Sequence, residues 1–530
     1  MDTERVNTEG PQVFLKTVTF NDGTQLPLDH NSIIVFTGAN NSGKSQVLKD
    51  LEEQLNQLRG WPTVVVQEAE YDYFGEIDDD KFLKDRFSRT REGFYQPYNS
   101  GASYTKESLV NTWNSRSFYN GFHLLFVKRL STELRLTVSN ELVRNEAHEN
   151  HPIFMLYKNE SLAQKISDYF RRAFGVDLVV NRAEMRTIPL HIGQAPDKTA
   201  YTIDKQDDYY KQVAALPKLQ DQGDGMRSYA SILLDTFTSD YSMTLIDEPE
   251  AFLHPPQARL LGKMLAKNNP DSRQLFISTH SEDFLQGLLD ADSSHVTVIR
   301  IDRADPVNRM SILENSRIQE LWGNPILRYS NILSGLFHEK VVVCESDYDC
   351  LFYQAVIDAM YEARNEIAPD LLFTHCGGKS RVKDVVKALR AVNVPVAAIC
   401  DFDLLNKKSE FKPLAEAFGL DWEAQLSADM KTVYDAANAS CGAWDWLKTT
   451  GKTGFQGGAP AAYEKVEQVC QSAGLFVVPV GEMECFDKTI NKKKKEWVYH
   501  VMTQYRLAAE PKLEAARQFI QLVVDFRPSV

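Results

Sequence analysis

The chain has 530 residues, of which 43% are hydrophobic, 11% aromatic and 25% charged, a composition typical of a globular protein with two to four domains. No run approaches the ~18 apolar residues that a membrane-spanning helix needs, and the first ten residues show no signal-peptide pattern, so we expect a cytoplasmic protein without a membrane partner. The net charge of −14 argues against a general nucleic-acid coat, although a local basic groove or an acidic, metal-binding site is compatible with it.

The first predicted elements lead to a glycine-rich loop. Residues 14–20 alternate apolar and polar side chains and precede an Asn-Asp-Gly turn, which predicts a strand pair. Residues 33–36 are apolar and predict a short buried strand, the loop Gly-Ala-Asn-Asn-Ser-Gly-Lys-Ser follows at 38–45, and residues 45–58 have a helical pattern. Strand, glycine loop and helix in this order indicate a phosphate-binding loop for a nucleoside triphosphate.

The residue types in this loop suit that chemistry. Gly38 and Gly43 allow the tight turn in which backbone N–H groups point at phosphate oxygens, and Asn40 and Asn41 lie between them. Lys44 is placed to reach the β- and γ-phosphates, and the hydroxyl of Ser45 is placed to bind Mg²⁺. The alternative is a glycine turn that matches by chance.

The next stretch is less informative. Residues 63–67 and 122–127 predict strands, and residues 70–120 between them lack clear periodicity. We interpret residues 70–120 as a surface insertion, with a nucleic-acid or partner surface as the alternative. No glutamine stands in an obvious position to touch the metal.

Two glycines open a later predicted helix. Residues 222–228 include Gly225 and Ser228 and precede a helical pattern at 229–237, which predicts a second anion site. This segment is too far along the chain to share the first loop's phosphate easily, so we expect it to serve the nucleotide of a second subunit.

Two further strands end in polar residues. The strand at 241–246 leads to Asp247, placed to hold Mg²⁺, and Glu248, placed to orient and deprotonate the attacking water. The alternative for this acidic pair is a helix cap. A strand at 275–279 ends at His280, which can hydrogen-bond the γ-phosphate.

These segments, in this order, resemble the ATP-binding-cassette (ABC) type of ATPase. The branch is that of the structural-maintenance-of-chromosomes (SMC), RecF-like and OLD (overcoming lysogenization defect) proteins. The resemblance implies that two heads sandwich two ATP molecules in a homodimer or higher oligomer, with Ser228 and its neighbours near the γ-phosphate of the other head. The Gly-Asp-Gly-Met-Arg-Ser segment, which includes Asp224 and Arg227, departs from the usual serine-glycine-glycine form. No long heptad pattern predicts coiled-coil arms.

A second unit begins near residue 336. Predicted strands at 340–344, 371–376, 394–400 and 475–480 alternate with helical patterns at 349–363 and 381–391, which indicates a parallel sheet. All seven cysteines lie in this part of the chain, and none forms a Cys-x-x-Cys pair, so neither a zinc site nor a disulfide framework is indicated.

Acidic residues follow the strands of this second unit. The set is Glu345, Asp349, Asp401, Asp403 and Glu484. Such hard oxygen ligands suit Mg²⁺ or Mn²⁺, and a pair of metals could activate water and stabilise the leaving oxygen of a phosphodiester. The alternative is that strand-end acids cap helices, most of all Asp349.

Here the sequence resembles a TOPRIM domain, the fold shared by topoisomerases, primases and OLD nucleases. The residues that carry the resemblance are Val-Val-Cys-Glu-Ser-Asp-Tyr-Asp at 342–349, Asp-Phe-Asp at 401–403 and Gly-Glu-Met-Glu at 481–484. The sequence departs from the pattern at Ser346, where a glycine is usual. The resemblance implies a late lysine that stabilises the transition state, with Lys488 and the run 492–495 as candidates, although such a run is often only a solvated face.

Together the sequence predicts an α/β protein: an ABC-type P-loop ATPase head at 1–335 and a TOPRIM domain at 336–530, which is the OLD architecture. The resemblance implies an ATP-dependent, metal-dependent endonuclease of anti-phage defence, with DNA favoured over RNA as substrate, ATP as either activator or inhibitor, and a defence-system protein or RNA as a further partner. One alternative is a PARIS-like effector that cuts transfer RNA, although its ATPase and nuclease are normally separate chains. Another is an ATP-gated scaffold or sensor without nuclease activity, against which the intact acidic set argues.

Overall fold

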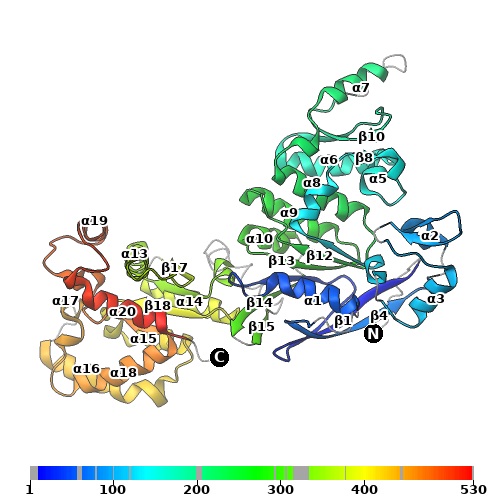
Figure 1. The fold of residues 1–530 in the computed structure, drawn as a ribbon. Helices are drawn as coiled ribbons and strands as arrows, with labels where there is room; N and C mark the ends of the chain where they lie inside the picture. Colours follow the sequence, from blue (N-terminus) through cyan, green and yellow to red (C-terminus); the bar gives the residue numbers. More distant parts are fainter. Residues whose placement is uncertain are drawn as a thin grey trace. The chain divides into compact units, whose positions relative to one another are not determined.

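The computed structural model describes two compact units, residues 1–315 and 316–530, each built from strands and helices (Figure 1). The described residues are 10–56, 62–77, 80–98, 101–118, 121–197, 206–291, 294–304, 307–313, 333–376, 378–441 and 446–527. Both units are α/β, as predicted. Among the described residues, no helix combines the length and the apolar character that crossing a membrane requires.

The first unit is organised around a six-stranded sheet. Its strands, in spatial order, are β15 (Val307–Leu313), β14 (Val296–Ala304), β3 (Ile33–Thr37), β13 (Gln274–Ser278), β12 (Met243–Asp247) and β7 (Val127–Leu130). All neighbours are parallel except β15, which runs antiparallel to β14. Because β3, β13 and β12 are adjacent, the loops that follow them meet at one edge of the sheet.

A smaller antiparallel sheet packs beside it, with the order β2 (Gln25–Pro27), β1 (Gln12–Phe20) and β4 (Val66–Phe74). The predicted hairpin at the start of the chain is therefore present. The side chain of Gln274 on β13 accepts from the N–H of Leu15 at 2.9 Å and donates to its carbonyl at 2.7 Å. This buried pair of bonds mimics a strand partner and fixes β1 to the central sheet.

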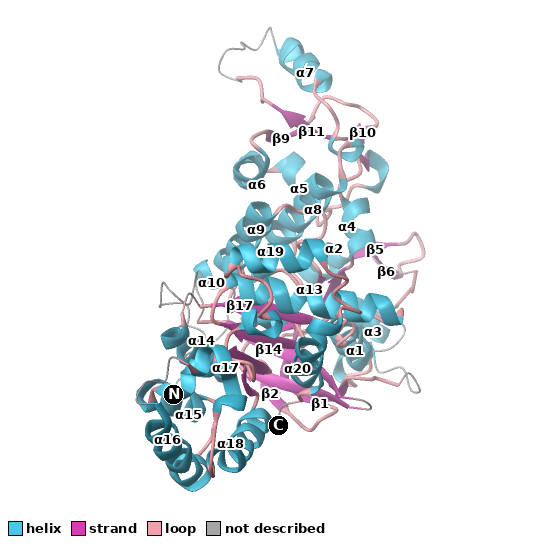
Figure 2. Cartoon of the chain, turned by 90° about the vertical axis from the view of Figure 1, so that its left-hand side faces the viewer, coloured by secondary structure: helices cyan, strands magenta, loops and turns pink. Residues whose placement is uncertain are grey.

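Helices cover the sheet and extend beyond it. They are α1 (Lys44–Asn56), α4 (Thr132–Val138), α5 (Pro152–Lys158), α6 (Glu160–Phe174), α7 (Gln206–Ala215), α8 (Asp224–Thr238), α9 (Pro255–Asn268) and α10 (Glu282–Ala291). Short strand pairs lie among them, from β8 (Leu142–Val143), β9 (Asp177–Val180), β10 (Thr187–Ile188) and β11 (Leu190–Gly193). Both views show α5, α6, α8 and α9 stacked between the sheet and α7 (Figure 2).

Two strand predictions in the first unit are wrong: one segment begins as a 3₁₀ turn, and the other strand lies further along the chain. The segment predicted as a strand at 122–127 begins with the 3₁₀ turn η1 (Phe122–Leu125), and β7 follows it. Its aromatic side chains turn into a cluster with Trp113 and Phe118, a preference that a short apolar run does not reveal. The strand predicted at 63–67 is displaced to β4, whose second half lies inside the predicted insertion.

The rest of that insertion contains α2 (Asp80–Arg86), β5 (Phe87–Arg89), β6 (Tyr95–Pro97) and α3 (Lys106–Asn114). Several of its aromatic residues are buried and continuous with the core that packs under β3 and α1. The buried aromatic side chains of the described part of this segment, among them Phe87, Trp113 and Phe118, thus serve packing.

The second unit has a four-stranded parallel sheet with the order β17 (Leu371–His375), β16 (Lys340–Cys344), β18 (Val396–Cys400) and β19 (Leu475–Val477). Its helices are α13 (Asp347–Arg364), α14 (Lys379–Ala391), α15 (Lys408–Ala417), α16 (Ser427–Cys441), α17 (Leu447–Thr450), α18 (Ala459–Ala473), α19 (Lys495–Gln504) and α20 (Glu514–Asp525). Side chains of α13, α19 and α20 share one apolar core with β16, β18 and β19. The strand predicted through residue 480 ends at Val477, and the chain then turns through Gly481 into the 3₁₀ turn η10 (Met483–Asp487).

A buried lysine ties α20 to the sheet. Lys340, at the start of β16, is only 3% exposed and donates to the carbonyls of Val523, Val524 and Phe526 at 2.7, 3.0 and 2.9 Å. These carbonyls end α20 and have no partner within the helix, so the ammonium group caps them.

We expect Lys340→Met to lower the free energy of unfolding by about 1–3 kcal/mol, because it keeps the aliphatic stem but leaves the carbonyl of Val523 without its side-chain donor, whereas Arg527 still donates to the carbonyls of Val524 and Phe526. Urea denaturation of the full chain measures the change, and Lys387→Met, an exposed lysine on α14, is the control. Equal stability of the two variants would contradict a capping role for Lys340.

Candidate functional site

The glycine loop after β3 has the backbone that phosphate binding requires. Gly38 and Gly43 have φ of +138° and +106°, and a Cβ at Gly38 would collide with the carbonyl oxygen of Ile301 on β14. Asn308 on β15 donates to the carbonyl of Ser42 at 2.6 Å and so holds the loop from the neighbouring strand pair. The loop is therefore shaped by contacts from β14 and β15 as well as by its own sequence.

The polar side chains of the loop bond to its backbone and to the end of β12. Lys44 is buried and its ammonium donates to the carbonyls of Gly38 and Ala39, both at 2.9 Å. Ser45 donates to Asp247 Oδ1 at 2.8 Å, so the predicted Mg²⁺ ligands from α1 and from β12 already touch. Asn40 and Asn41 lie exposed at the loop tip, with Asn41 in the left-handed region at φ +62°.

The ends of β12 and β13 bring the other predicted residues together. The N–H of Glu248 donates to the carbonyl of Ser278 at 2.9 Å, and the Ser278 hydroxyl donates to Asp247. His280 Nδ1 lies 3.3 Å from Glu248 Oε1. Glu248 has φ of +46°, a strained conformation for a residue with a side chain, and such strain is concentrated at functional sites.

Glu250 is a residue that the sequence analysis missed. Its buried carboxylate accepts from the Thr279 hydroxyl at 2.8 Å and from the His280 N–H at 3.0 Å, so it holds the loop that carries His280. Burial raises the pKa of Glu250, and these hydrogen bonds oppose the shift. The sequence Asp-Glu-Pro-Glu at 247–250 could have indicated a role for Glu250, since this third acid closely follows the acidic pair.

The start of α8 presents a different picture from the prediction. Gly223 and Asp224 are exposed, and Gly225 packs so closely on the carbonyl of Phe252 that a side chain would not fit. Ser228 is fully buried and accepts from Arg135 Nε at 2.9 Å, inside its own head. A contact from Ser228 to a second subunit's nucleotide therefore stays a prediction.

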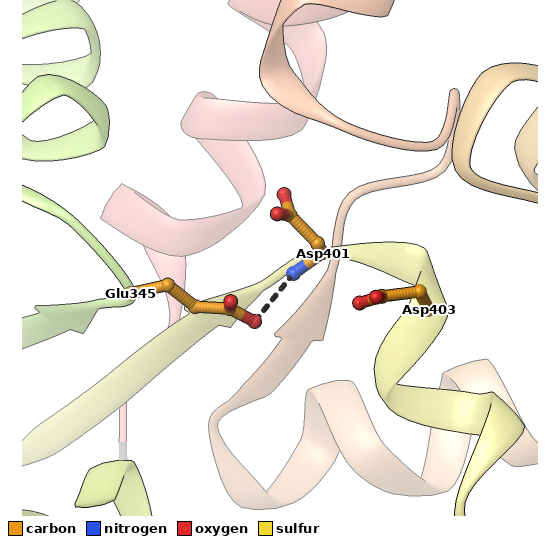
Figure 3. A group of neighbouring side chains, drawn as sticks. All are labelled: Glu345, Asp401 and Asp403. Atoms are coloured by element: carbon orange, nitrogen blue, oxygen red, sulfur yellow. Dashed lines mark hydrogen bonds between the residues drawn. The ribbon is translucent and has the colours of Figure 1, made fainter. Parts of the chain in front are cut away.

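In the second unit, three of the predicted acids converge. Among the residues that the structure describes, Glu345, Asp401 and Asp403 form the group whose carboxylate oxygens lie within 4.8 Å of one another. Glu345 follows β16 and the two aspartates follow the adjacent β18, so sheet topology places them together (Figure 3). The N–H of Asp401 donates to Glu345 Oε1 at 3.1 Å.

The other two predicted ligands have structural partners. Asp349 accepts from the N–H and the hydroxyl of Ser346, at 3.0 and 2.8 Å, and caps α13, as the alternative interpretation held. Glu484 accepts from the N–H of Lys494 at 2.7 Å. Metal binding by Asp349 and Glu484 stays a prediction.

The acids of this group repel one another and raise one another's pKa. Burial raises the pKa of Asp401 well above its usual value, and the charges of Glu345, Asp349, Glu482 and Asp403 add to the shift. Burial likewise raises the pKa of Asp349 and of Glu482. Three carboxylates with hard oxygen donors and unfavourable mutual charge fit a divalent cation such as Mg²⁺ or Mn²⁺.

We expect the affinity for Mn²⁺ to rise with pH, because a cation must displace the proton that the raised pKa keeps on Asp401. Without a cation, the free energy of unfolding contributed by Asp401 falls as pH rises through the raised pKa, since the folded state then binds more protons than the unfolded state. Calorimetric titration of Mn²⁺ in buffers of different ionisation enthalpy counts the protons released. Asp401→Asn should release fewer; identical release from both proteins would contradict the assignment.

The structure adds a lysine that the sequence analysis did not single out. Lys448 Nζ on α17 lies 3.3 Å from Asp403 Oδ2 and 4.0 Å from Glu482 Oε1. The predicted Lys488 ends η10 with an exposed side chain. No motif marks Lys448, which belongs to a stretch without clear pattern, and only the packing of α17 against the Gly481 turn brings it to the acids.

Comparison with known proteins matches both units to families. Residues 62–285 match the family described as "AAA domain, putative AbiEii toxin, Type IV TA system", and residues 336–403 match "Overcoming lysogenization defect protein-like, TOPRIM domain". The first match begins after the glycine loop.

Two curated nucleases are similar to the chain. The Old nuclease of Escherichia phage P2 is 25% identical over 293 residues, which cover 51% of this chain and 47% of that protein. The OLD nuclease of Thermus scotoductus is 25% identical over 174 residues, which cover 30% of each. The chain thus spans half or less of the length of these relatives.

Among solved structures, the chain is similar to an SMC head bound to the C-winged helix domain of ScpA, with 12% identity, a TM-score of 0.34 and coverage of 58% of this chain and 99% of that chain. The SMC head domain from Thermotoga maritima has 10% identity, a TM-score of 0.27 and coverage of 57% and 98%. The two family matches and the curated relatives give the chain an AAA_21 ATPase domain, an OLD-like TOPRIM domain and distant homology to OLD nucleases.

Proposed function

We propose that this protein binds and hydrolyses ATP and cuts DNA in a reaction that requires Mg²⁺ or Mn²⁺, as an OLD-type endonuclease of anti-phage defence. The observation that carries the proposal is the convergence of Glu345, Asp401 and Asp403 at the carboxyl edge of a parallel sheet. The other unit of the same chain carries a phosphate-binding loop. Two curated relatives are named as nucleases. In this proposal residues 1–335 form the ATPase part and residues 336–530 the nuclease part.

In the ATPase part, each residue has a role that its position supports. Lys44 exchanges its two carbonyl partners for the β- and γ-phosphates, and Ser45 and Asp247 hold Mg²⁺. Glu248 accepts the proton of the attacking water, and His280 bonds the γ-phosphate. Gly225 and the start of α8 face the nucleotide of a second copy, in a homodimer or larger oligomer that forms through the heads.

In the nuclease part, Glu345, Asp401 and Asp403 hold the cations, with Asp349 and Glu484 close enough to complete a second site after local rearrangement. The cations supply an activated water and stabilise the leaving oxygen of the phosphodiester. Lys448, whose Nζ lies 3.3 Å from Asp403 Oδ2, takes the charge-stabilising role for which the sequence analysis offered Lys488 and the run 492–495.

The exposed run of four lysines at 492–495 supports a nucleic-acid substrate. Lys494 donates its N–H to Glu484, and Lys493 opposes the raised pKa of Glu482, so the run begins beside the acids. Such a run can follow a phosphate backbone past the metal site.

We expect the triple change Lys492→Gln, Lys493→Gln and Lys495→Gln to weaken DNA binding uniformly across sequences and to reduce the slope of log K against log[salt] by about 1–3. Lys494 is left intact because it has φ of +47° and is the N-cap of α19. Fluorescence anisotropy from 50 to 300 mM salt measures the slope. The control changes three exposed lysines elsewhere in the unit, at 431, 452 and 465. An equal loss of DNA affinity in both variants would contradict the role of residues 492–495 in DNA binding.

The experiment that tests the function incubates the purified chain with plasmid DNA and with bulk RNA, each with Mg²⁺ or Mn²⁺ and with or without ATP. Cleavage of DNA supports the proposal, and the ATP lanes give the sign of the coupling. Cleavage of RNA alone would support instead the alternative hypothesis of an effector that cuts transfer RNA. ATP hydrolysis without any cleavage would leave a scaffold or sensor.

A further inference from the structure

One buried arginine in the first unit makes hydrogen bonds with all of its donors. Arg135 on α4 is fully buried, yet its guanidinium bonds no carboxylate. Its acceptors are the hydroxyls of Ser228 at 2.9 Å and Thr132 at 3.4 Å and the carbonyls of Leu130 at 3.1 Å, Glu248 at 2.9 Å and Asp247. Five N–H donors thus meet five acceptors, a geometry that lysine cannot reproduce.

The acceptors belong to elements that are distant in sequence. Leu130 ends β7, Ser228 lies in the second turn of α8, and Asp247 with Glu248 ends β12. Arg135 therefore spans the space between the helix that begins with Gly223–Gly225 and the backbone that carries the proposed catalytic carboxylate.

The bond to the Glu248 carbonyl bears on a strained residue. Glu248 has φ of +46°, and its peptide groups are held on one side by the Ser278 carbonyl and on the other by Arg135 and the Ala251 N–H. A left-handed residue other than glycine persists only where its surroundings hold it. Removing the guanidinium would release one of those restraints.

Nearby acids make the buried charge tolerable. Burial lowers the pKa of Arg135, and the carboxylates of Glu250, Asp247 and Glu248 oppose the shift. The charge of Arg135 is thus offset by a group of acids that includes Asp247 and Glu248, whose carbonyls it also bonds.

We propose that Arg135 is a positioning residue that ties the placement of Glu248 to the position of α8, through Ser228. This proposal rests on the proposed ATPase function and deepens it. The exposed first turn of α8 is where a second copy would present its nucleotide, so a shift of α8 on docking reaches Glu248 through one side chain. Hydrolysis would then depend on the second copy without any residue of that copy touching the attacking water.

The test compares Arg135→Lys, Ser228→Ala and the double variant in steady-state ATP hydrolysis by the full chain. We expect each single variant to lower kcat by about 10–100-fold with KM for ATP changed less than about threefold, because the carboxylate is misplaced while the phosphate loop is intact. We expect the double variant to be no slower than the slower single variant, since both changes break one link.

The matched control is Arg273→Lys. Arg273 is also buried, at 3% exposure, and donates to the carbonyls of Thr236 and Ser239 at the other end of α8. It should lower Tm with little effect on kcat. Equal losses of kcat in the Arg135 and Arg273 variants, or additive losses in the double variant, would overturn the proposal and leave Arg135 a structural residue.

Two further outcomes distinguish a failure of the role proposed for Arg135 from a failure of the proposed ATPase function. If the wild-type chain binds ATP and does not hydrolyse it, the ATPase function fails and the role of Arg135 in hydrolysis fails with it. If wild type hydrolyses ATP but Arg135→Lys does not fold, Ser228→Ala decides alone: a lowered kcat at constant KM and Tm supports the link, and an unchanged kcat overturns it.

Discussion

Glu345→Gln is expected to lower the metal-dependent cleavage of plasmid DNA by about 10²–10³-fold, and to leave ATP hydrolysis unchanged. Glu345 supplies one of the three carboxylates that converge within 4.8 Å, and its Oε1 also accepts from the N–H of Asp401. Glutamine retains the size and that acceptor but removes the charge, so the fold is kept while a cation loses a ligand. Densitometry of supercoiled, nicked and linear plasmid over time measures the rate.

The control is Glu362→Gln, a change of the same kind at an exposed position of α13. A second check is Mn²⁺ titration, in which the Glu345 variant should need a higher concentration to saturate. Full cleavage by the Glu345 variant in Mg²⁺ would place the nuclease centre elsewhere, and a matching loss in the control would point to general damage.

Glu248→Gln is expected to lower kcat for ATP hydrolysis by about 10²–10⁴-fold while ATP still binds with wild-type affinity. The side chain lies beside His280, and the phosphate loop with Lys44 and Ser45 is separate from it. Glutamine can orient a water but cannot take its proton. Release of phosphate measures kcat, and a fluorescent ATP analogue measures binding.

Asp271→Asn, at an exposed turn before β13, is the control for loss of a carboxylate on the same unit. The Glu248 variant has a second use. Because it holds ATP without turnover, DNA cleavage by this variant in the presence of ATP separates an effect of bound nucleotide from an effect of hydrolysis. Retained hydrolysis in Glu248→Gln would move the general base to another group.

The parts of the molecule that could be predicted are those in which short stretches of adjacent residues determine both the local structure and the chemistry. The loop from Gly38 to Ser45 is recognisable from the sequence, because its left-handed backbone and its contacts with phosphate restrict the residue types that each position accepts. Glu345, Asp401 and Asp403 were predictable together, since acids after parallel strands must share one edge of a sheet. The helical pattern predicted at 349–363 corresponds to α13, which begins two residues earlier because Ser346 and Asp349 cap its first turn.

The rest depended on contacts between distant residues. Arg135 and Lys448 lie in segments without any motif, and only the packing of α4 and α17 brings them to their acids. The strand predicted at 122–127 was wrong because a short apolar run fits a strand and a 3₁₀ turn equally well, and the aromatic cluster around Phe118 decides between them. Asp349 shows the reverse case, in which a residue with the chemistry of a ligand serves as a cap.

The clamp between Lys340 and the end of α20 has a consequence for how the second unit is made. Lys340, on the first strand of its sheet, donates to carbonyls about 180 residues later in the chain, so α20 must leave the ribosome before that strand gains this contact. The phosphate loop at 38–45, by contrast, is synthesised early. During translation the chain would therefore complete its phosphate loop well before the second unit gains this clamp.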